Sequence, residues 1–184
     1  MSLEIVLGPM FSGKSSYALS FIRRQEVIGK KIVVIKPDID QRYSNKNVLV
    51  THDQEMVPCI LWKTYKPLCE TSDILEANCI VVEEAQFFRG LHSFIKHMME
   101  NYKKHILIVG LDGDRMQKPF GEILDCIPWA TSLKKLHALC CECSDGTPAH
   151  YTASKRFFET EEQVSVGGLE KYSAVCLKHL LDKE

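Results

Sequence analysis

Short apolar runs alternate with longer stretches of mixed polarity as far as about residue 130. The runs are rich in Val, Ile and Leu and have the length of buried β-strands; they cover residues 3–7, 32–35, 79–82 and 106–109. Helical patterns lie between them, near residues 15–28, 67–76 and 90–102. Strands that alternate with helices predict an α/β fold with a parallel sheet and helical crossovers.

One segment interrupts this alternation. Residues 37–53 are polar and rich in turn formers, with no apolar period, so the pattern predicts a mobile loop there. The chain has 184 residues, of which 45% are hydrophobic, and this is enough to bury one substantial core. We expect one core and a small appended module.

A glycine-rich motif stands between the first apolar run and the first helix. It is a phosphate-binding loop with the strand and helix flanks that this motif requires, and it reads Gly8-Pro9-Met10-Phe11-Ser12-Gly13-Lys14-Ser15. The glycines let backbone N–H groups converge on phosphate oxygens, and Lys14 adds a positive charge. Ser15 would hold Mg²⁺. The alternative is a glycine turn with an exposed lysine; the flanks favour a protein that binds a nucleoside triphosphate.

Two carboxylates follow the third apolar run. Glu83 and Glu84 come directly after residues 80–82, where a parallel strand would deliver them to the edge of the sheet that binds ligands. Glu83 could bind Mg²⁺ through water, and Glu84 could accept a proton from an attacking hydroxyl group. The alternative is that these carboxylates are an ordinary solvated strand end. The phosphate loop in the same chain favours the functional interpretation.

Two pairs of metal-binding residue types lie late in the chain. The segments Cys140-Cys141-Glu142-Cys143 and Cys176-Leu177-Lys178-His179 each hold two potential ligands with a spacing of two residues, which suits tetrahedral zinc. Four protein ligands leave no open position, so this zinc would be structural. Cys141 could compete with Cys140 as a ligand, and reduced cysteines packed as small apolar residues are the alternative to a metal site.

The charge and the cysteine content of the chain indicate which partners and which cellular compartment to expect. The formal net charge is -1 and no block of Lys or Arg stands out, so we expect no nucleic-acid partner. No stretch is long enough to span a bilayer and no leader is evident, so we expect a soluble protein without a membrane partner. The 8 cysteines then belong to a reducing, cytoplasmic setting, where paired cysteines are metal ligands.

Several motifs in the same order make the chain resemble the type II (cytosolic) thymidine kinase family. They are the phosphate loop, Glu84-Ala85-Gln86-Phe87-Phe88, Lys118-Pro119-Phe120-Gly121, Gly167-Gly168 and the late Cys/His pair. The resemblance implies transfer of the γ-phosphoryl group of ATP to the 5′-hydroxyl of thymidine or deoxyuridine in deoxynucleotide salvage. It also implies a kinase core over residues 1–136, a zinc-binding lasso over 137–184, a homotetramer, and dTTP as a feedback inhibitor.

The same resemblance assigns the donor site and the metal ligands. Glu84 would be the general base. The ATP and Mg²⁺ site would comprise residues 8–15 together with Asp40, Gln41, Arg42, Glu83 and Gln86. The family commonly has Asp where this chain has Glu83. For zinc, the comparison favours Cys140 over Cys141 and gives the set Cys140, Cys143, Cys176 and His179.

The resemblance also implies an apolar nucleoside pocket covered by a lasso whose main chain contacts the base. Its residues would be Met10, Phe87, Leu111, Phe120 and Tyr172, with the lasso residues Gln163, Val164, Ser165, Val166 and Gly167. Taken alone, most of these aromatic residues would be ordinary core residues. Arg115 stands where many relatives have an aromatic residue, and it could stack on a base or point to solvent.

Three functions therefore remain open at the level of sequence. The first is a deoxynucleoside kinase, and the second is a phosphate-loop kinase with a different acceptor. The third is a non-catalytic ATP-binding module whose zinc knuckle docks nucleic acid. The third requires a basic surface near the zinc pairs, yet acidic residues are frequent there.

Overall fold

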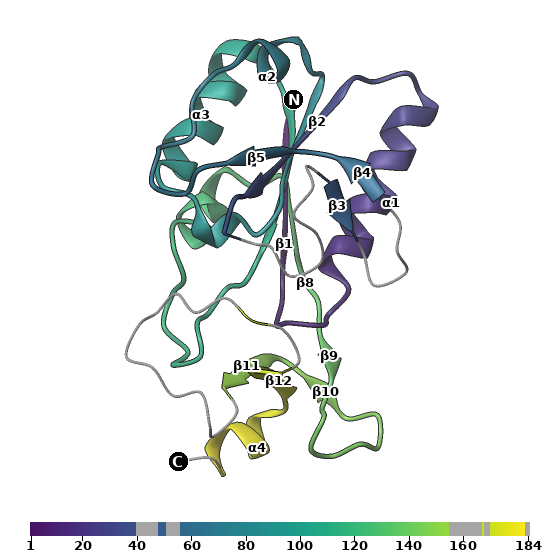
Figure 1. Ribbon diagram of the computed structural model, residues 1–184, viewed down its shortest axis with the longest axis vertical. Coiled ribbons are helices and arrows are strands. Elements are labelled where there is room, and N and C mark those ends of the chain that lie inside the picture. Colours follow the sequence, from purple (N-terminus) through teal and green to yellow (C-terminus); the bar gives the residue numbers. More distant parts are fainter. Residues whose placement is uncertain (40–47, 51–55, 155–166, 168–169, 183–184) are drawn as a thin grey trace.

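The protein is built on a six-stranded sheet with the strand order β5-β2-β6-β7-β1-β8, and all its paired strands are parallel. The computed structural model describes residues 1–39, 48–50, 56–154, 167 and 170–182. The sheet strands are β1 (Ser2–Leu7), β2 (Ile32–Pro37), β5 (Ile60–Trp62), β6 (Cys79–Val82), β7 (His105–Gly110) and β8 (Ser132–Lys135). The predicted α/β class is confirmed (Figure 1).

Helices cover both faces of this sheet, as the nearly uninterrupted apolar strands require. One face packs against α2 (Ser72–Glu76), α3 (Leu91–Tyr102) and the 3₁₀ helix η2 (Leu124–Trp129). The other face packs against α1 (Lys14–Val27), which buries Leu19 and Ile22 on it. Successive strand residues alternate between the two cores, so that Ile5 and Ile108 face one and Val6 and Val109 face the other.

The helix expected near residues 67–76 is shorter than its sequence pattern indicated. Only Ser72–Glu76 is helical, and Thr71 is its N-cap, with its hydroxyl accepting from the N–H of Ile74 at 3.4 Å. Ahead of it, the N–H of Leu68 donates to the carbonyl of Arg89, which holds the chain outside the helix. The four predicted strands and the other two helices are confirmed, whereas the short strands β5 and β8 were not predicted.

The segment predicted as a loop contains a strand. Residues Val48–Val50 (β3) pair antiparallel with β4 (Met56–Pro58), so the prediction of a loop is wrong for these positions. Residues 40–47 and 51–55 lie outside the described residues. Across the described chain, no helix is long and apolar enough to cross a membrane.

A small module follows β8 beyond the carboxyl end of β1 (Figure 1). It consists of the hairpin β9 (Ala138–Leu139) with β10 (Pro148–Ala149), the pair β11 (Tyr151–Ser154) with β12 (Tyr172–Val175), and α4 (Leu177–Leu181). Its buried core is separate from the two cores of the main sheet and is made of small side chains, mainly Ala and Cys. The module therefore buries little apolar area of its own.

Candidate functional site

The loop after β1 has the close backbone packing that its glycines predict. A Cβ atom at Gly8 would lie 2.7 Å from the carbonyl oxygen of Leu136, so only glycine fits there. Gly13 has φ 79° and is the N-cap of α1. Lys14 is buried, and its Nζ donates to the carbonyl of Pro9 at 2.6 Å. This arrangement places a helix N-terminus and an ammonium group together, as an anion site requires.

Glu83 lies at the end of β6 on the α1 side and is only 2% exposed. Burial, with a smaller contribution from the charge of Glu84, raises its pKa from 4.5 to about 7, although a hydrogen bond from Ser15 and the charge of Lys14 act in the opposite direction. In the described part of the chain, its Oε1 atom has no hydrogen-bond partner. A buried carboxylate oxygen without a partner, next to the hydroxyl of Ser15, suits a bound cation.

Glu84 is the N-cap of the 3₁₀ helix η1 (Ala85–Phe87) and has a left-handed backbone, with φ 50° and ψ 47°. This conformation is unfavourable for a residue with a Cβ atom and occurs frequently at functional sites. Its Oε2 atom accepts a hydrogen bond from Nε2 of Gln86 at 2.7 Å. The structure thus holds a half-buried carboxylate in a fixed orientation at the edge of the sheet.

Two of the residues predicted for the nucleoside pocket are in direct contact. The rings of Phe87 and Phe120 meet edge to face, with centroids 5.3 Å apart. Both rings line a pocket of about 320 Å³, together with Gln86, Phe88 and residues in the segments that follow β2 and β5. Its other lining residues are Ile39, Thr64, Tyr65, Arg89, Gly121 and Glu122.

The remaining predicted pocket residues are not among the residues that line this cavity. Leu111 donates its N–H to Oε1 of Gln86, and Arg115 lies in the turn before Phe120. Met10 and Tyr172 are both buried, in the phosphate loop and in β12. Gly167 is described and buried. Asp40, Gln41, Arg42 and the lasso residues Gln163, Val164, Ser165 and Val166 lie outside the described residues.

Thr152 on β11 contacts the candidate site, and the sequence did not reveal this contact. Its buried hydroxyl accepts from the N–H of Met10 at 3.0 Å, and its carbonyl accepts from Nε2 of Gln117 at 3.4 Å. The small module therefore contacts both the phosphate loop and the turn that carries Arg115. A threonine in a strand is common, so no sequence signal marks this tertiary contact.

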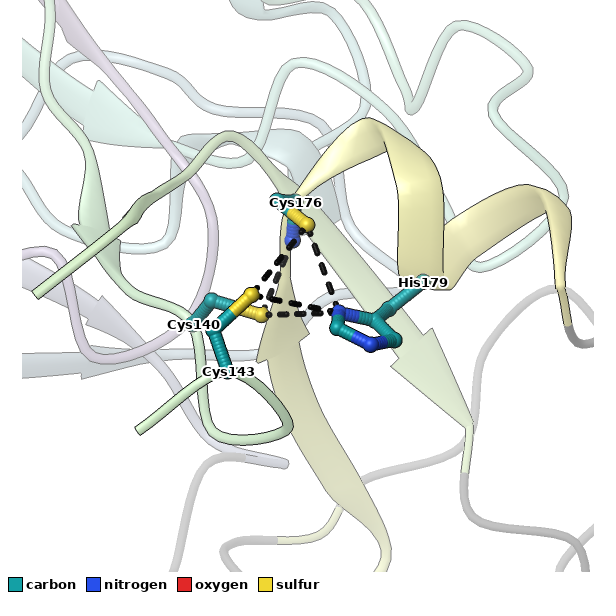
Figure 2. A group of neighbouring side chains, drawn as sticks. All are labelled: Cys140, Cys143, Cys176 and His179. Atoms are coloured by element: carbon teal, nitrogen blue, oxygen red, sulfur yellow. Dashed lines mark hydrogen bonds between the residues drawn. The ribbon is translucent and has the colours of Figure 1, made fainter. Parts of the chain in front are cut away.

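The two Cys/His pairs converge as their spacing predicts (Figure 2). Sγ of Cys140, Cys143 and Cys176 and Nδ1 of His179 all lie within 4.8 Å of one another. Burial opposes ionisation of Cys140, but N–H groups of Cys143, Cys176 and Glu142 outweigh it and lower its pKa to about 6. Cys141 is exposed and not part of the cluster. Three sulfurs and one imidazole nitrogen are a donor set consistent with zinc.

Comparisons with known proteins agree with this geometry. The family model described as thymidine kinase matches residues 1–180. The chain is 37% identical over 174 residues to a thymidine kinase of Yaba monkey tumor virus, covering 95% of this chain and 91% of the relative. It is 36% identical over 178 residues to the cytosolic thymidine kinase of Homo sapiens, covering 95% and 70%. A thymidine kinase of Sheeppox virus is 34% identical over 176 residues, covering 96% and 94%. The chain therefore belongs to the thymidine kinase family and is an enzyme with thymidine kinase activity.

Proposed function

We propose that this enzyme transfers the γ-phosphoryl group of ATP to the 5′-hydroxyl of thymidine, or of deoxyuridine, with Glu84 as the general base. The observation that carries this assignment is the carboxylate of Glu84, held by Gln86 at the same sheet edge as the phosphate loop. A carboxylate in that place can accept the proton of an attacking hydroxyl group. The 5′-oxygen then bonds to the γ-phosphorus, the bond to the bridging oxygen breaks, and ADP leaves.

The donor half of the site is the loop from Gly8 to Ser15. Its N–H groups and Lys14 bind phosphate oxygens, and their charge stabilises the transferring group. Glu83 and Ser15 would hold Mg²⁺, which would supply positive charge against the phosphates. The partnerless Oε1 of Glu83, seen in the described residues, supports this role. We assign Asp40, Gln41 and Arg42 to the same phosphates by resemblance alone.

The acceptor half is an apolar pocket for the nucleoside. We assign Phe87 and Phe120 to its wall, because their rings line the same cavity next to Gln86. Met10, Leu111, Arg115 and Tyr172 and the main chain of residues 163–167 complete it by resemblance. The contact between Met10 and Thr152 supports an acceptor site that borders both the loop and the small module.

The Cys/His cluster is proposed to hold a structural zinc ion that clamps the base of the lasso. With four protein donors it leaves no open position for chemistry. A kinase core of residues 1–136 and a zinc-binding domain of residues 137–184 fit the separate cores on the two sides of that boundary. We also propose a cytoplasmic homotetramer, inhibited by dTTP and without nucleic-acid or membrane partners, from the family resemblance and the near-neutral charge.

Substitution of Glu84 by Gln tests the proposed base. Glu84→Gln keeps the shape of the side chain but removes the proton acceptor, so we expect kcat to fall at least about 100-fold with thymidine binding nearly unchanged. Steady-state kinetics and calorimetric binding of thymidine measure the two effects. Glu100→Gln removes an exposed carboxylate on α3 and serves as the control. Turnover near the wild-type rate in Glu84→Gln would contradict the assignment.

The raised pKa of Glu83 gives a pH-dependent stability in the absence of Mg²⁺ and nucleotide. Because the pKa in the folded state, about 7, lies above the 4.5 of the unfolded chain, the wild-type protein loses stability as pH rises through that interval. Glu83→Gln is spared this loss, so its free energy of unfolding should exceed that of the wild type by about 3 kcal/mol above pH 7. Urea unfolding from pH 4 to pH 8 measures the difference. Equal profiles for the two proteins would refute a buried, destabilised Glu83.

Loss of a zinc ligand should weaken thymidine binding before it unfolds the main sheet. We expect Cys176→Ser to raise the thymidine KM by about 10-fold or more, the scale of a disturbed metal shell, before the α/β core unfolds. Kinetics at graded chelator concentrations, followed in parallel by circular dichroism, separate the two events. Cys69→Ser, at an exposed cysteine outside the cluster, is the matched control. Simultaneous loss of activity and helical signal would indicate one cooperative unit instead.

Arg115 is the residue in which we expect acceptor selectivity to differ from that of relatives with an aromatic residue. We predict retained preference for thymidine, with relative kcat/KM for 5-substituted analogues changing by about 10-fold in Arg115→Phe, within the range of base–aromatic stacking. The panel comprises thymidine, deoxyuridine, deoxycytidine and 5-substituted deoxyuridines with ATP and Mg²⁺. Identical selectivity in the two proteins would remove any special role for Arg115, and a wild-type preference for deoxycytidine would overturn the proposed acceptor.

A further inference from the structure

We propose that Gln86 is a positioning residue, which fixes the carboxylate of Glu84 against the end of β7 through its side-chain amide. This inference rests on the proposed role of Glu84 as the base. The resemblance placed Gln86 in the ATP site, and the structure shows two hydrogen bonds of its side chain, to Glu84 and to Leu111.

The side-chain amide of Gln86 connects a hydrogen-bond acceptor, the carboxylate of Glu84, with a hydrogen-bond donor, the N–H of Leu111. Its Nε2 donates to Oε2 of Glu84 at 2.7 Å, and its Oε1 accepts from the N–H of Leu111 at 3.0 Å. An ionised carboxylate only accepts and a backbone N–H only donates, so one orientation of the amide satisfies both. The side chain is nearly completely buried, at 3% exposure, and in this setting an unpaired amide would be costly.

Two glycines provide the space that this connection occupies. A Cβ atom at Gly110, the last residue of β7, would lie 2.4 Å from Oε1 of Gln86. A Cβ atom at Gly121 would lie 2.1 Å from the main-chain oxygen of Gln86. Neither distance is compatible with a larger residue in this conformation. Gly110 therefore leaves room for the side-chain oxygen of Gln86, and Gly121 leaves room for its main chain.

In the reaction, this contact would control the orientation of the Glu84 carboxylate and not the binding of substrates. Glu84 lies in a short irregular segment, where rotation of its side chain would turn the carboxylate away from the acceptor hydroxyl. A hydrogen bond to one carboxylate oxygen, anchored in the sheet through Leu111, limits that rotation. Since Leu111 is also assigned to the nucleoside pocket, the base and the pocket wall share one rigid support. Errors of about 1 Å in such positioning can reduce a rate about 100-fold.

A variant of similar shape without hydrogen-bonding groups tests the role. We expect Gln86→Met to reduce kcat about 100-fold while the KM for ATP stays within twofold of the wild type. Gln86→Glu puts a second carboxylate against Glu84 and should reduce kcat at least as much. Lys104→Met is the matched control, because Lys104 is also a buried polar residue with two side-chain hydrogen bonds, to the carbonyls of Leu75 and Ala77. It precedes β7 at the end of the strand opposite to Gly110. Its kcat should remain that of the wild type.

The Glu84→Asp background distinguishes positioning of Glu84 from general support of the fold. Aspartate is one methylene group shorter than glutamate and should lie beyond hydrogen-bonding distance of Gln86. Adding Gln86→Met should then change the remaining kcat, measured with radiolabelled thymidine, less than twofold. An equal loss in both backgrounds would overturn the proposal, and so would wild-type kcat in Gln86→Met alone. If Glu84→Gln has the kcat of the wild type, both the base assignment and this inference fail. If only Gln86→Met has the kcat of the wild type, the base assignment stands and this inference alone fails.

Discussion

Parallel strands deliver the residues that follow them to one edge of the sheet, and in this chain β1 and β6 both end there against β7. Leu7 is paired with Gly110 and Val82 with Ile108, so the phosphate loop and Glu84 follow at nearly the same height. The donor loop, the carboxylates and the pocket wall are brought together by this register. A shift of one strand by a single residue would turn its side chains toward the opposite core and move the carboxylates away from the phosphate loop.

Two neighbouring carboxylates at this edge have different surroundings, and this difference separates their roles. Glu83 points into the α1 side, where burial raises its pKa and, within the described chain, one oxygen has no partner. Glu84 is half-buried and is held by the amide of Gln86. The first environment favours a group that is neutralised by a cation or a proton, and the second favours a group oriented toward a substrate. In many active sites, similar side chains have different roles because their environments differ.

The sequence predicted the features that depend on neighbours along the chain and missed those that depend on contacts across it. The loop from Gly8 to Ser15 and the Cys/His pairs have local spacings that dictate their geometry, so both were predictable. The contact of Thr152 with Met10 joins residues 142 positions apart, and no local pattern encodes it. The helix before β6 was predicted too long because Leu68 pairs with Arg89 instead of entering the helical turn. In both of these cases a tertiary hydrogen bond decided the outcome.

The Cys/His cluster and the phosphate loop are parts of one connected structure. The core of the small module consists mainly of Ala and Cys side chains, whose burial contributes little free energy, so a metal bound at the Cys/His cluster would stabilise it. Its strand β11 carries Thr152, which holds the N–H of Met10 in the phosphate loop. The same residue accepts from Gln117 in the turn of Arg115. The Cys/His cluster at the start of α4 is thus connected, through β12 and its paired strand β11, to both the phosphate loop and the turn of Arg115.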